Sequence, residues 1–389
     1  MTDLNPMIAA PSARPAVRLM AAPLLAAMLS LAMPAVPAAA AVSSTVGKAL
    51  NAAQAAAKAG KSADAIKSVN EARAAAKTDE EKQKSAQMAA YVFTQAGRYA
   101  DAAAALQSVG AGPAQLAPLY YRAGQYDKAI AEARKGGGEQ MQILIAQALL
   151  RKGDNKGAVA AYQALIKANG PKAIYLENLA GAQFKSGDKA GYLATTERLV
   201  RSDGSPARWG ALLSNFRQNP MRPEAKLAMF HLMQATGNMS RPEDYAEFAK
   251  LALVAGQAGV ATSALAKANL PDDAMSKHLG EAAQKMAASA ATDAAKMAAA
   301  PNTAFRGGGA YMGLGQYDNA IAAYDKAIAG GGTAIDQARL FKGIAALKAG
   351  KTSVGKAAFE SVTDKGGMQD IAHLWGLYAS TRGSIPAAS

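Results

Sequence analysis

Cysteine is absent from this chain of 389 residues. Its absence excludes disulfide bonds, thiolate nucleophiles, zinc sites built on thiolates and a lipid-modified N-terminal cysteine. A form of the protein outside the cytoplasm must therefore be held together by packing alone.

Histidine is also scarce, since His231, His278 and His373 are the three in the chain. His231 and His373 lie in apolar helical stretches, which favours a core or boundary position over a ligand role. His278 and Glu281 have an i, i+3 spacing that could hold a metal ion, but catalytic zinc needs three protein ligands. The chain also lacks the G-x-S-x-G and H-E-x-x-H motifs. We predict that it is not an enzyme and has no metal site and no cofactor.

Long apolar runs are missing after the first forty residues, so no later segment is predicted to span a bilayer. Near the N-terminus, Arg14 and Arg18 precede an apolar run that ends in small residues, with A-x-A cleavage choices between Ala38 and Ala41. We interpret residues 1–41 as a cleaved signal peptide, which predicts a periplasmic or secreted protein. The alternative is a transmembrane anchor, but this run is diluted by alanine and interrupted by proline.

Half of the residues are hydrophobic, so the chain has enough apolar material to fold. The formal net charge is +14, and lysine and arginine are spread along the whole chain. An even spread favours solubility as the reason for the charge. Outside the cytoplasm, a basic protein meets anionic lipid, anionic glycan and acidic polypeptide more often than nucleic acid. We therefore expect no nucleic-acid partner.

Nearly the same heptapeptide occurs twice, as GQYDKAI at 124–130 and GQYDNAI at 315–321. Alignment on its glycine reveals eight similar segments, most of them about 34 residues apart. Two apolar-periodic stretches around a central glycine predict a helix-turn-helix repeat. The eight glycines are Gly60, Gly97, Gly124, Gly153, Gly187, Gly256, Gly315 and Gly350.

Each position of the repeat has a physical role. The glycine ends the first helix in a left-handed conformation that costs other residues about 1 to 2 kcal/mol. A small residue five positions later lets the two helices approach closely, and a larger residue follows one helical turn on. The small residues are Ala65, Ala102, Ala129, Ala158, Ala261, Ala320 and Gly355. The larger ones are Val69, Leu106, Tyr162, Leu265, Tyr324 and Phe359.

The pattern resembles the tetratricopeptide repeat, most closely over AFRGGGAYMGLGQYDNAIAAYDKAIAGGG. The matching positions are Gly308, Tyr311, Gly315, Tyr317, Ala320, Tyr324 and Ala327. The resemblance covers most of residues 46–380 and implies an all-α fold, a right-handed superhelical solenoid of helix-turn-helix repeats. In such a solenoid each repeat touches mainly its neighbours. The whole chain looks like an exported bacterial protein of this family, and the resemblance carries no activity with it.

The expected organisation follows the spacing of the repeats. After residues 1–41 we expect repeats at 42–270, an alanine-rich spacer segment at 271–300, and further repeats with a capping helix at 301–389. An irregular unit at 206–240 contains RQNPMRPE, a longer turn with prolines.

The segment 271–300 lacks the central glycine and repeats the dipeptide Lys-Met at 285–286 and 296–297, near one face of a helix. One interpretation is a helix that lies on a membrane surface. Its apolar content is mostly alanine, which gives little burial in lipid and favours a packing or spacer helix.

Glycine-rich turns at helix starts can bind phosphate, so RGGGAYMGLG and AGQYDKAI have a second interpretation as anion sites. Neither contains G-K-[ST] and neither follows a β-branched strand. We interpret both as joints between helices.

A basic residue stands two positions before five of the eight turn glycines: Lys58, Arg122, Arg151, Lys185 and Lys348. The helix dipole favours a cation there by about 0.3 to 1 kcal/mol, which explains the column without any ligand.

The family resemblance adds a second interpretation, because the first helix of each pair then lines a concave groove. Arg122, Arg151 and Lys185 would form a basic track in that groove beside Tyr121, Leu150 and Phe184. Such a track suits an acidic or carboxylate-bearing peptide. The lysine-asparagine clamp of some family members is not recognisable, since its positions hold Ala114, Ile143 and Glu177.

Two functions of different classes remain open. The first is an exported scaffold that binds a protein or peptide of the cell envelope without catalytic chemistry. The alternative is a basic binder of an anionic glycan or lipid surface in the cell envelope.

Overall fold

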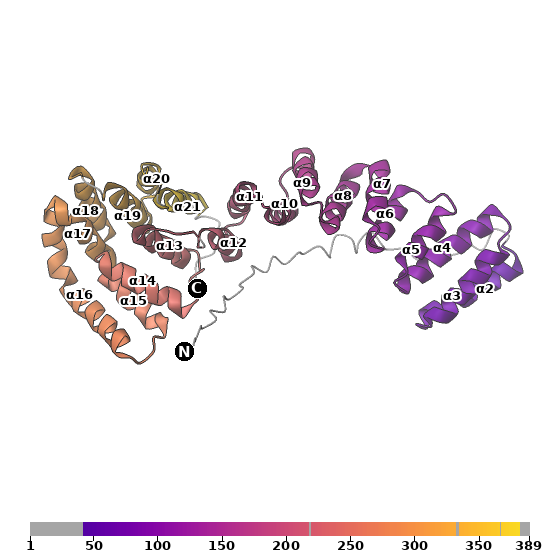
Figure 1. The fold of residues 1–389 in the computed structure, drawn as a ribbon, viewed down its shortest axis with the longest axis horizontal. Helices are drawn as coiled ribbons and strands as arrows, with labels where there is room; N and C mark the ends of the chain where they lie inside the picture. Colours follow the sequence, from indigo (N-terminus) through magenta and orange to yellow (C-terminus); the bar gives the residue numbers. More distant parts are fainter. Residues whose placement is uncertain (1–41, 218, 332–333, 366, 382–389) are drawn as a thin grey trace, which may run out of the picture. The chain divides into compact units, whose positions relative to one another are not determined.

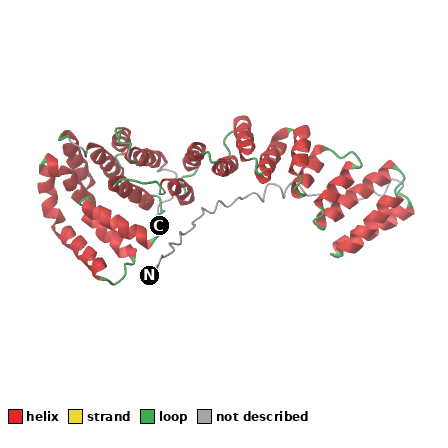
Figure 2. Ribbon diagram, viewed as in Figure 1, coloured by secondary structure: helices red, strands yellow, loops and turns green. Residues whose placement is uncertain are grey.

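The computed structural model describes residues 42–217, 219–331, 334–365 and 367–381. Within these ranges the regular structure is helical and no strand is found (Figure 2). The predicted all-α fold of helix-turn-helix repeats is therefore confirmed. The predicted signal peptide at 1–41 lies outside the described residues. No helix in the described ranges combines the length and the apolar character needed to cross a membrane.

Two compact units make up the chain, and they divide between Thr195 and Thr196, inside helix α11. In the first unit the main contacts join each helix to the next one or two helices along the chain (Figure 1). This unit therefore follows the predicted nearest-neighbour packing. Its helices α2 to α11 are Ser44–Lys58, Ser62–Ala75, Asp79–Gln95, Tyr99–Gln107, Pro113–Arg122, Tyr126–Gly136, Gly138–Lys152, Asn155–Asn169, Ala173–Ser186 and Lys189–Ser202, the last continuing into the second unit.

The eight predicted turn glycines all adopt positive φ angles, between 70° and 91°. At each turn the residue after the glycine donates its N–H to the carbonyl five residues earlier, at 2.7 to 2.9 Å. These hydrogen bonds satisfy carbonyls that the end of a helix would leave without partners. Gly110 and Gly237 form two further turns of the same kind, which the repeat spacing does not predict.

Alanine at the helix crossings is fully packed. Ala102, Ala129 and Ala158 are 0% exposed, and the larger residues Leu106 and Tyr162 are 2% and 1% exposed. The same pattern holds in the second unit, except that Leu265 is only partly buried. Small side chains let two backbones approach, and the larger ones fill the space one turn away.

The start of the first unit is fixed by a buried carboxylate. Oε1 of Glu81 accepts the N–H of Ser43 at 2.9 Å, and Oε2 accepts the N–H of Lys77 at 2.8 Å. Glu81 also forms a capping box with Thr78 at the start of α4. The hydrogen bonds from Ser43, and then those from the backbone of Lys77 and Thr78, lower the pKa of Glu81 to about 2. Glu81 thereby joins the start of α2 to the start of α4.

The second unit closes on itself, because α13 packs against α14 and also against α19 and α21 (Figure 1). Trp375 Nε1 donates to the carbonyl of Ala228 at 3.1 Å, across 147 residues of sequence. Arg222 pairs with Asp364 in the same region. Most contacts in this unit still join helices that follow one another, as predicted, but the long-range contacts of α13 with α19 and α21 are an addition that the repeat pattern does not predict. Helices α12 to α21 are Pro206–Phe216, Pro223–Ala235, Pro242–Val254, Ala258–Ala268, Ala274–Ala299, Pro301–Gly313, Tyr317–Ala329, Ile335–Lys348, Thr352–Glu360 and Met368–Thr381.

Three consecutive glycines in α17 each face a different neighbour. A Cβ atom on Gly307 would lie 2.5 Å from the backbone nitrogen of Ala298 in α16. One on Gly308 would lie 2.6 Å from the ring of Tyr324, and one on Gly309 would lie 2.0 Å from the carbonyl oxygen of Ala255. This packing supports the interpretation of RGGGAYMGLG as a joint. It also shows that α16, in the segment predicted as a spacer, packs directly on α17.

Candidate functional site

Contacts between successive turns explain why the heptapeptide recurs. Lys152 Nζ lies 2.5 Å from Asp127 Oδ1 of the first copy, and Lys351 Nζ lies 2.9 Å from Asp318 Oδ1 of the second. In each copy the aspartate therefore pairs with a lysine at the next turn glycine of its unit. These pairs are exposed, so each contributes under about 1 kcal/mol and acts mainly on register.

Arg122, the first residue of the predicted basic track, is engaged with the preceding turn. Its guanidinium lies 5.4 Å from the centre of the Tyr99 ring, and Nη1 donates to the Tyr99 hydroxyl at 3.3 Å. Lys348 makes the equivalent contact with Tyr317 in the second unit, at 5.8 Å. Arg122 and Lys348, two of the basic residues that precede a turn glycine, thus contact the neighbouring repeat. These contacts are a second reason for a cation at this position, besides the helix dipole.

Arg151 and Lys185 differ from Arg122 in their surroundings. Both are exposed at the ends of α8 and α10, and neither forms an ion pair with the residues that the structure describes. Their turns are adjacent, because Asn155 Nδ2 donates to the carbonyl of Lys185 at 3.4 Å. The structure therefore brings these two cations to neighbouring turns.

The three apolar residues predicted beside the track have different environments. Leu150 is 6% exposed and packs with Ala158 and Ala182, so it belongs to the core and not to a contact surface. Tyr121 is partly buried, with its ring 5.7 Å from that of Tyr126. Phe184 is 50% exposed, and its ring lies 5.7 Å from that of Tyr192.

Arg151, Phe184 and Lys185 form what we call the α8–α10 patch. An aromatic ring that is half exposed leaves apolar area in contact with water, and burial of that area against a partner is favourable. The two cations at these adjacent turns can bind carboxylates. The patch is thus suited to a surface that presents an apolar group next to acidic ones.

The histidines do not form a site. His231 is buried, its Nε2 lies 2.7 Å from Gln257 Oε1, and burial lowers its pKa to about 3. His278 and Glu281 are both exposed, and the described residues contain no group of three side chains placed to hold a metal ion. His373 is exposed and bonded to Glu197 at 3.0 Å, so the expected core or boundary position is wrong for its side chain.

Comparison with known families identifies repeats in both units. The family profile described as tetratricopeptide repeat matches residues 143–207 and residues 305–367. The first match contains the α8–α10 patch, and the second runs from α17 to α20. No curated protein sequence matches the chain.

The solved structures that match this chain share little sequence with it. A tetratricopeptide repeat protein from Parabacteroides merdae ATCC 43184 is 12% identical with a TM-score of 0.20, over 76% of this chain and 99% of that one. Naa15/Naa10 bound to HypK-THB is 14% identical with a TM-score of 0.36, over 86% of this chain and 56% of that one. The TPR2AB-domain:pHSP90 complex of yeast Sti1 is 14% identical with a TM-score of 0.21, over 86% and 98%. These values carry no conclusion about what this chain binds.

The two profile matches coincide with helix pairs and glycine turns in the structure. In both matched segments, α-helices alternate with left-handed glycine turns, as the repeat pattern predicts. Residues 143–207 and 305–367 are thus similar to tetratricopeptide repeats in sequence and in their pattern of helices and turns.

Proposed function

We propose that this protein is a scaffold that binds a partner protein or peptide through the α8–α10 patch and performs no chemistry of its own. The observation that carries the proposal is the half-exposed ring of Phe184, next to Lys185 in α10 and one turn away from Arg151 at the end of α8. Arg151 and Lys185 are exposed and form no ion pair with the residues that the structure describes. Helical repeat folds use extended surfaces of this kind to bind partners.

The chemistry of the patch defines the partner. Aromatic and arginine side chains contribute most to binding at protein interfaces, and nearby charges set the association rate. The partner should therefore present an apolar side chain flanked by carboxylates. Because the N-terminal sequence has the pattern of a signal peptide, we place this partner in the cell envelope.

A photo-crosslinking amino acid at position 184 tests the surface directly. The protein carrying it would be exposed to a cell-envelope extract, illuminated and examined for crosslinked products by mass spectrometry. The matched control carries the same group at Gln163, an exposed position on α9. We expect a discrete protein adduct at 184 and none at 163. Equal products at both positions, or none at 184, would exclude the patch.

Charge reversal distinguishes specific binding at the α8–α10 patch from nonspecific attraction by the overall positive charge of the protein. Arg151→Glu with Lys185→Glu should reduce affinity for the crosslinked partner by at least about tenfold, whereas Lys156→Glu with Lys189→Glu should have little effect. Lys156 and Lys189 are exposed and follow the same two turns. Equal losses for the two pairs, accompanied by equal losses of binding to anionic vesicles or glycan, would favour the surface-binding alternative.

The proposed location has its own test. The intact mass of the exported protein should place the mature N-terminus between Ala39 and Ser43. Retention of residues 1–38 would contradict the cleaved signal peptide and would leave the proposal for the binding patch unaffected.

A further inference from the structure

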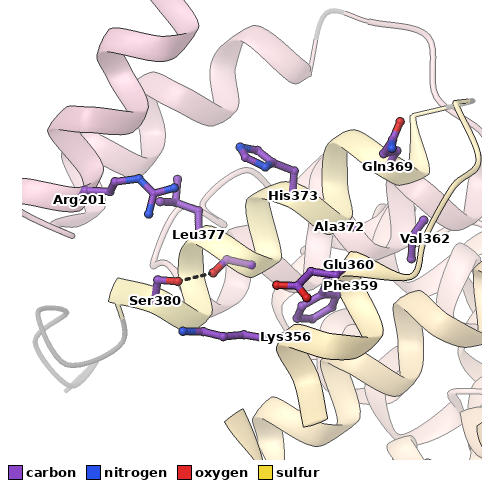
Figure 3. Close-up of a pocket in the computed structure, with 11 residues that line it drawn as sticks. Arg201, Lys356, Phe359, Glu360, Val362, Gln369, Ala372, His373, Leu377 and Ser380 are labelled. Carbon is purple, nitrogen blue, oxygen red and sulfur yellow. Dashed lines mark hydrogen bonds between the residues drawn. The ribbon is translucent and has the colours of Figure 1, made fainter. Parts of the chain in front are cut away.

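A cavity of about 330 Å³ lies in the second unit among α11, α20 and α21 (Figure 3). Arg201 comes from α11, Lys356 and Glu360 come from α20, and Leu377 comes from α21. Ligand pockets begin at about 300 Å³, so the cavity has room for a small molecule.

The charged groups of this cavity are available. Lys356 and Glu360 are one helical turn apart on α20, in the order lysine before glutamate, which pairs less well than the reverse. Neither they nor Arg201 form an ion pair with the residues that the structure describes. In a larger cavity of about 550 Å³ between the α12–α13 and α20–α21 connections, by contrast, Arg222 already pairs with Asp364.

Apolar groups form the rest of the wall. Phe359, Val362 and Leu377 contribute to it, and each is at most 4% exposed. Gly376 lies within α21 and also faces the cavity, where a Cβ atom built on it would meet nothing within 4 Å. Glycine is unfavourable inside a helix, and here no neighbouring atom requires it. Its presence keeps space open in the cavity.

We infer that this cavity binds a free α-amino acid with an apolar side chain. The ligand carboxylate would pair with Arg201 and Lys356, the ammonium group with Glu360, and the side chain would lie against Phe359 and Leu377 in the space beside Gly376. The two cations can pair with the carboxylate of the ligand and Glu360 can pair with its ammonium group, so these three side chains are complementary to a zwitterion. Glu360 disfavours a phosphate dianion as the ligand, because the glutamate carboxylate would repel the negative charge of the phosphate. This small-molecule site is independent of the α8–α10 patch.

Matched ligands test the two charge contacts. Isothermal titration calorimetry would measure binding of leucine, methionine and phenylalanine to the full chain, with glycine as the control without an apolar side chain. Leucinamide lacks the carboxylate, and N-acetyl-leucine lacks the ammonium group. We expect leucine, methionine or phenylalanine to bind with a Kd of about 1 mM or tighter, and its amide and N-acetyl derivatives to bind at least about tenfold more weakly. The inference is wrong if none of the three binds in that range, or if either derivative binds as tightly as the parent.

Substitutions in the protein test the same contacts independently of changes in the ligand. Arg201→Gln and Glu360→Gln should each weaken binding at least about tenfold, whereas Arg198→Gln on the same α11 and Glu281→Gln on α16 should not. Gly376→Leu should abolish binding by filling the cavity, while circular dichroism shows an intact fold and an unchanged or higher Tm. Gly376→Ala provides a milder version if leucine disturbs the fold. Unchanged binding in a folded Gly376→Leu variant would overturn the proposed location.

Discussion

The two units of this protein are built from the same kind of helix pair but are stabilised differently. In the first unit, α2 to α10 make their main contacts with helices one or two positions along the chain. In the second, the last helix α21 returns to α13, and Trp375 binds the carbonyl of a residue 147 positions earlier. A nearest-neighbour array can lose structure from an end or in parts, whereas a closed unit must lose its distant contacts together. We expect the second unit to unfold more cooperatively.

The chain carries its own reporter for this difference. Its two tryptophans, Trp209 and Trp375, both lie in the second unit. Tryptophan fluorescence therefore follows the second unit, and far-ultraviolet circular dichroism follows both. Hydrogen exchange read by mass spectrometry can then assign a change to particular helices.

Opening the closed unit should have the largest effect. Trp375→Ala removes a side chain that is 2% exposed and that stacks on Phe359 with ring centres 6.0 Å apart. We expect a loss of about 3 to 5 kcal/mol in the free energy of unfolding of the second unit. Urea melts followed by the fluorescence of Trp209 measure it, and faster hydrogen exchange should extend to both α13 and α21.

The matched change in the first unit is Leu106→Ala, at a position that is 2% exposed. This substitution should lower the free energy of unfolding of the first unit by about 2 to 5 kcal/mol. Faster exchange should stay near α4 to α7, and the fluorescence melt should not shift. An effect that spreads through the whole chain would contradict the division into separately stabilised units.

Crowding α17 should have the next largest effect. Gly309→Ala places a Cβ atom 2.0 Å from the carbonyl oxygen of Ala255, so the backbone must shift, at a cost of about 1 to 3 kcal/mol. Gly280→Ala in α16 is the control, because its Cβ atom meets nothing within 4 Å and alanine favours the helix by up to about 1 kcal/mol. Fluorescence-detected urea melts should move in opposite directions for the two variants. Urea midpoints that shift in the same direction for both variants would show that the close approach of Gly309 to Ala255 does not determine the stability of the second unit.

Acid should weaken the two units in different pH ranges. Burial lowers the pKa of His231 from 6.5 to about 3, so below pH 6.5 the unfolded chain binds a proton that the folded second unit does not. This histidine should lower the stability of the second unit by at most about 1.4 kcal/mol per pH unit as the pH falls towards 3. Glu81 in the first unit has its pKa lowered from 4.5 to about 2, so its contribution is complete above pH 4.5 and is lost between pH 4.5 and 2.

Melts at a series of pH values measure both effects. The fluorescence-detected stability should decline from pH 6.5 to 5 in the natural protein and less steeply in His231→Leu. Glu81→Gln should be less stable than the natural protein at pH 7, and this difference should close between pH 4.5 and 2. A fluorescence-detected stability that does not change between pH 6.5 and 5 would rule out the assigned role of His231.

The smallest effect should come from the contact between turns in the first unit. A double-mutant cycle of Asp127→Asn and Lys152→Gln should give a coupling free energy of about 0.2 to 1 kcal/mol, since both side chains are exposed. The coupling should decrease in high salt. A coupling free energy above 2 kcal/mol would mean that this ion pair contributes substantially to stability and does not act only on how successive turns align.

The candidate site was only partly predictable. Spacing placed Arg122, Arg151 and Lys185 in one column, because each precedes a turn glycine by two residues. The sequence could not show that Arg122 contacts Tyr99, or that Leu150 is buried, because both depend on how one helix pair is rotated against the next. The cavity at Arg201 and Glu360 was missed entirely, since its walls come from segments separated by more than a hundred residues.

The sequence by itself determined the helices, their glycine turns and the small residues at the crossings. These features depend on contacts within one repeat, where glycine conformation and helical periodicity decide the outcome. Only the tertiary structure decided that the second unit closes through α13 and α21, and which charged side chains remain outside ion pairs. Those outcomes depend on the accumulated rotation of many helix pairs, to which every side chain at every crossing contributes a little.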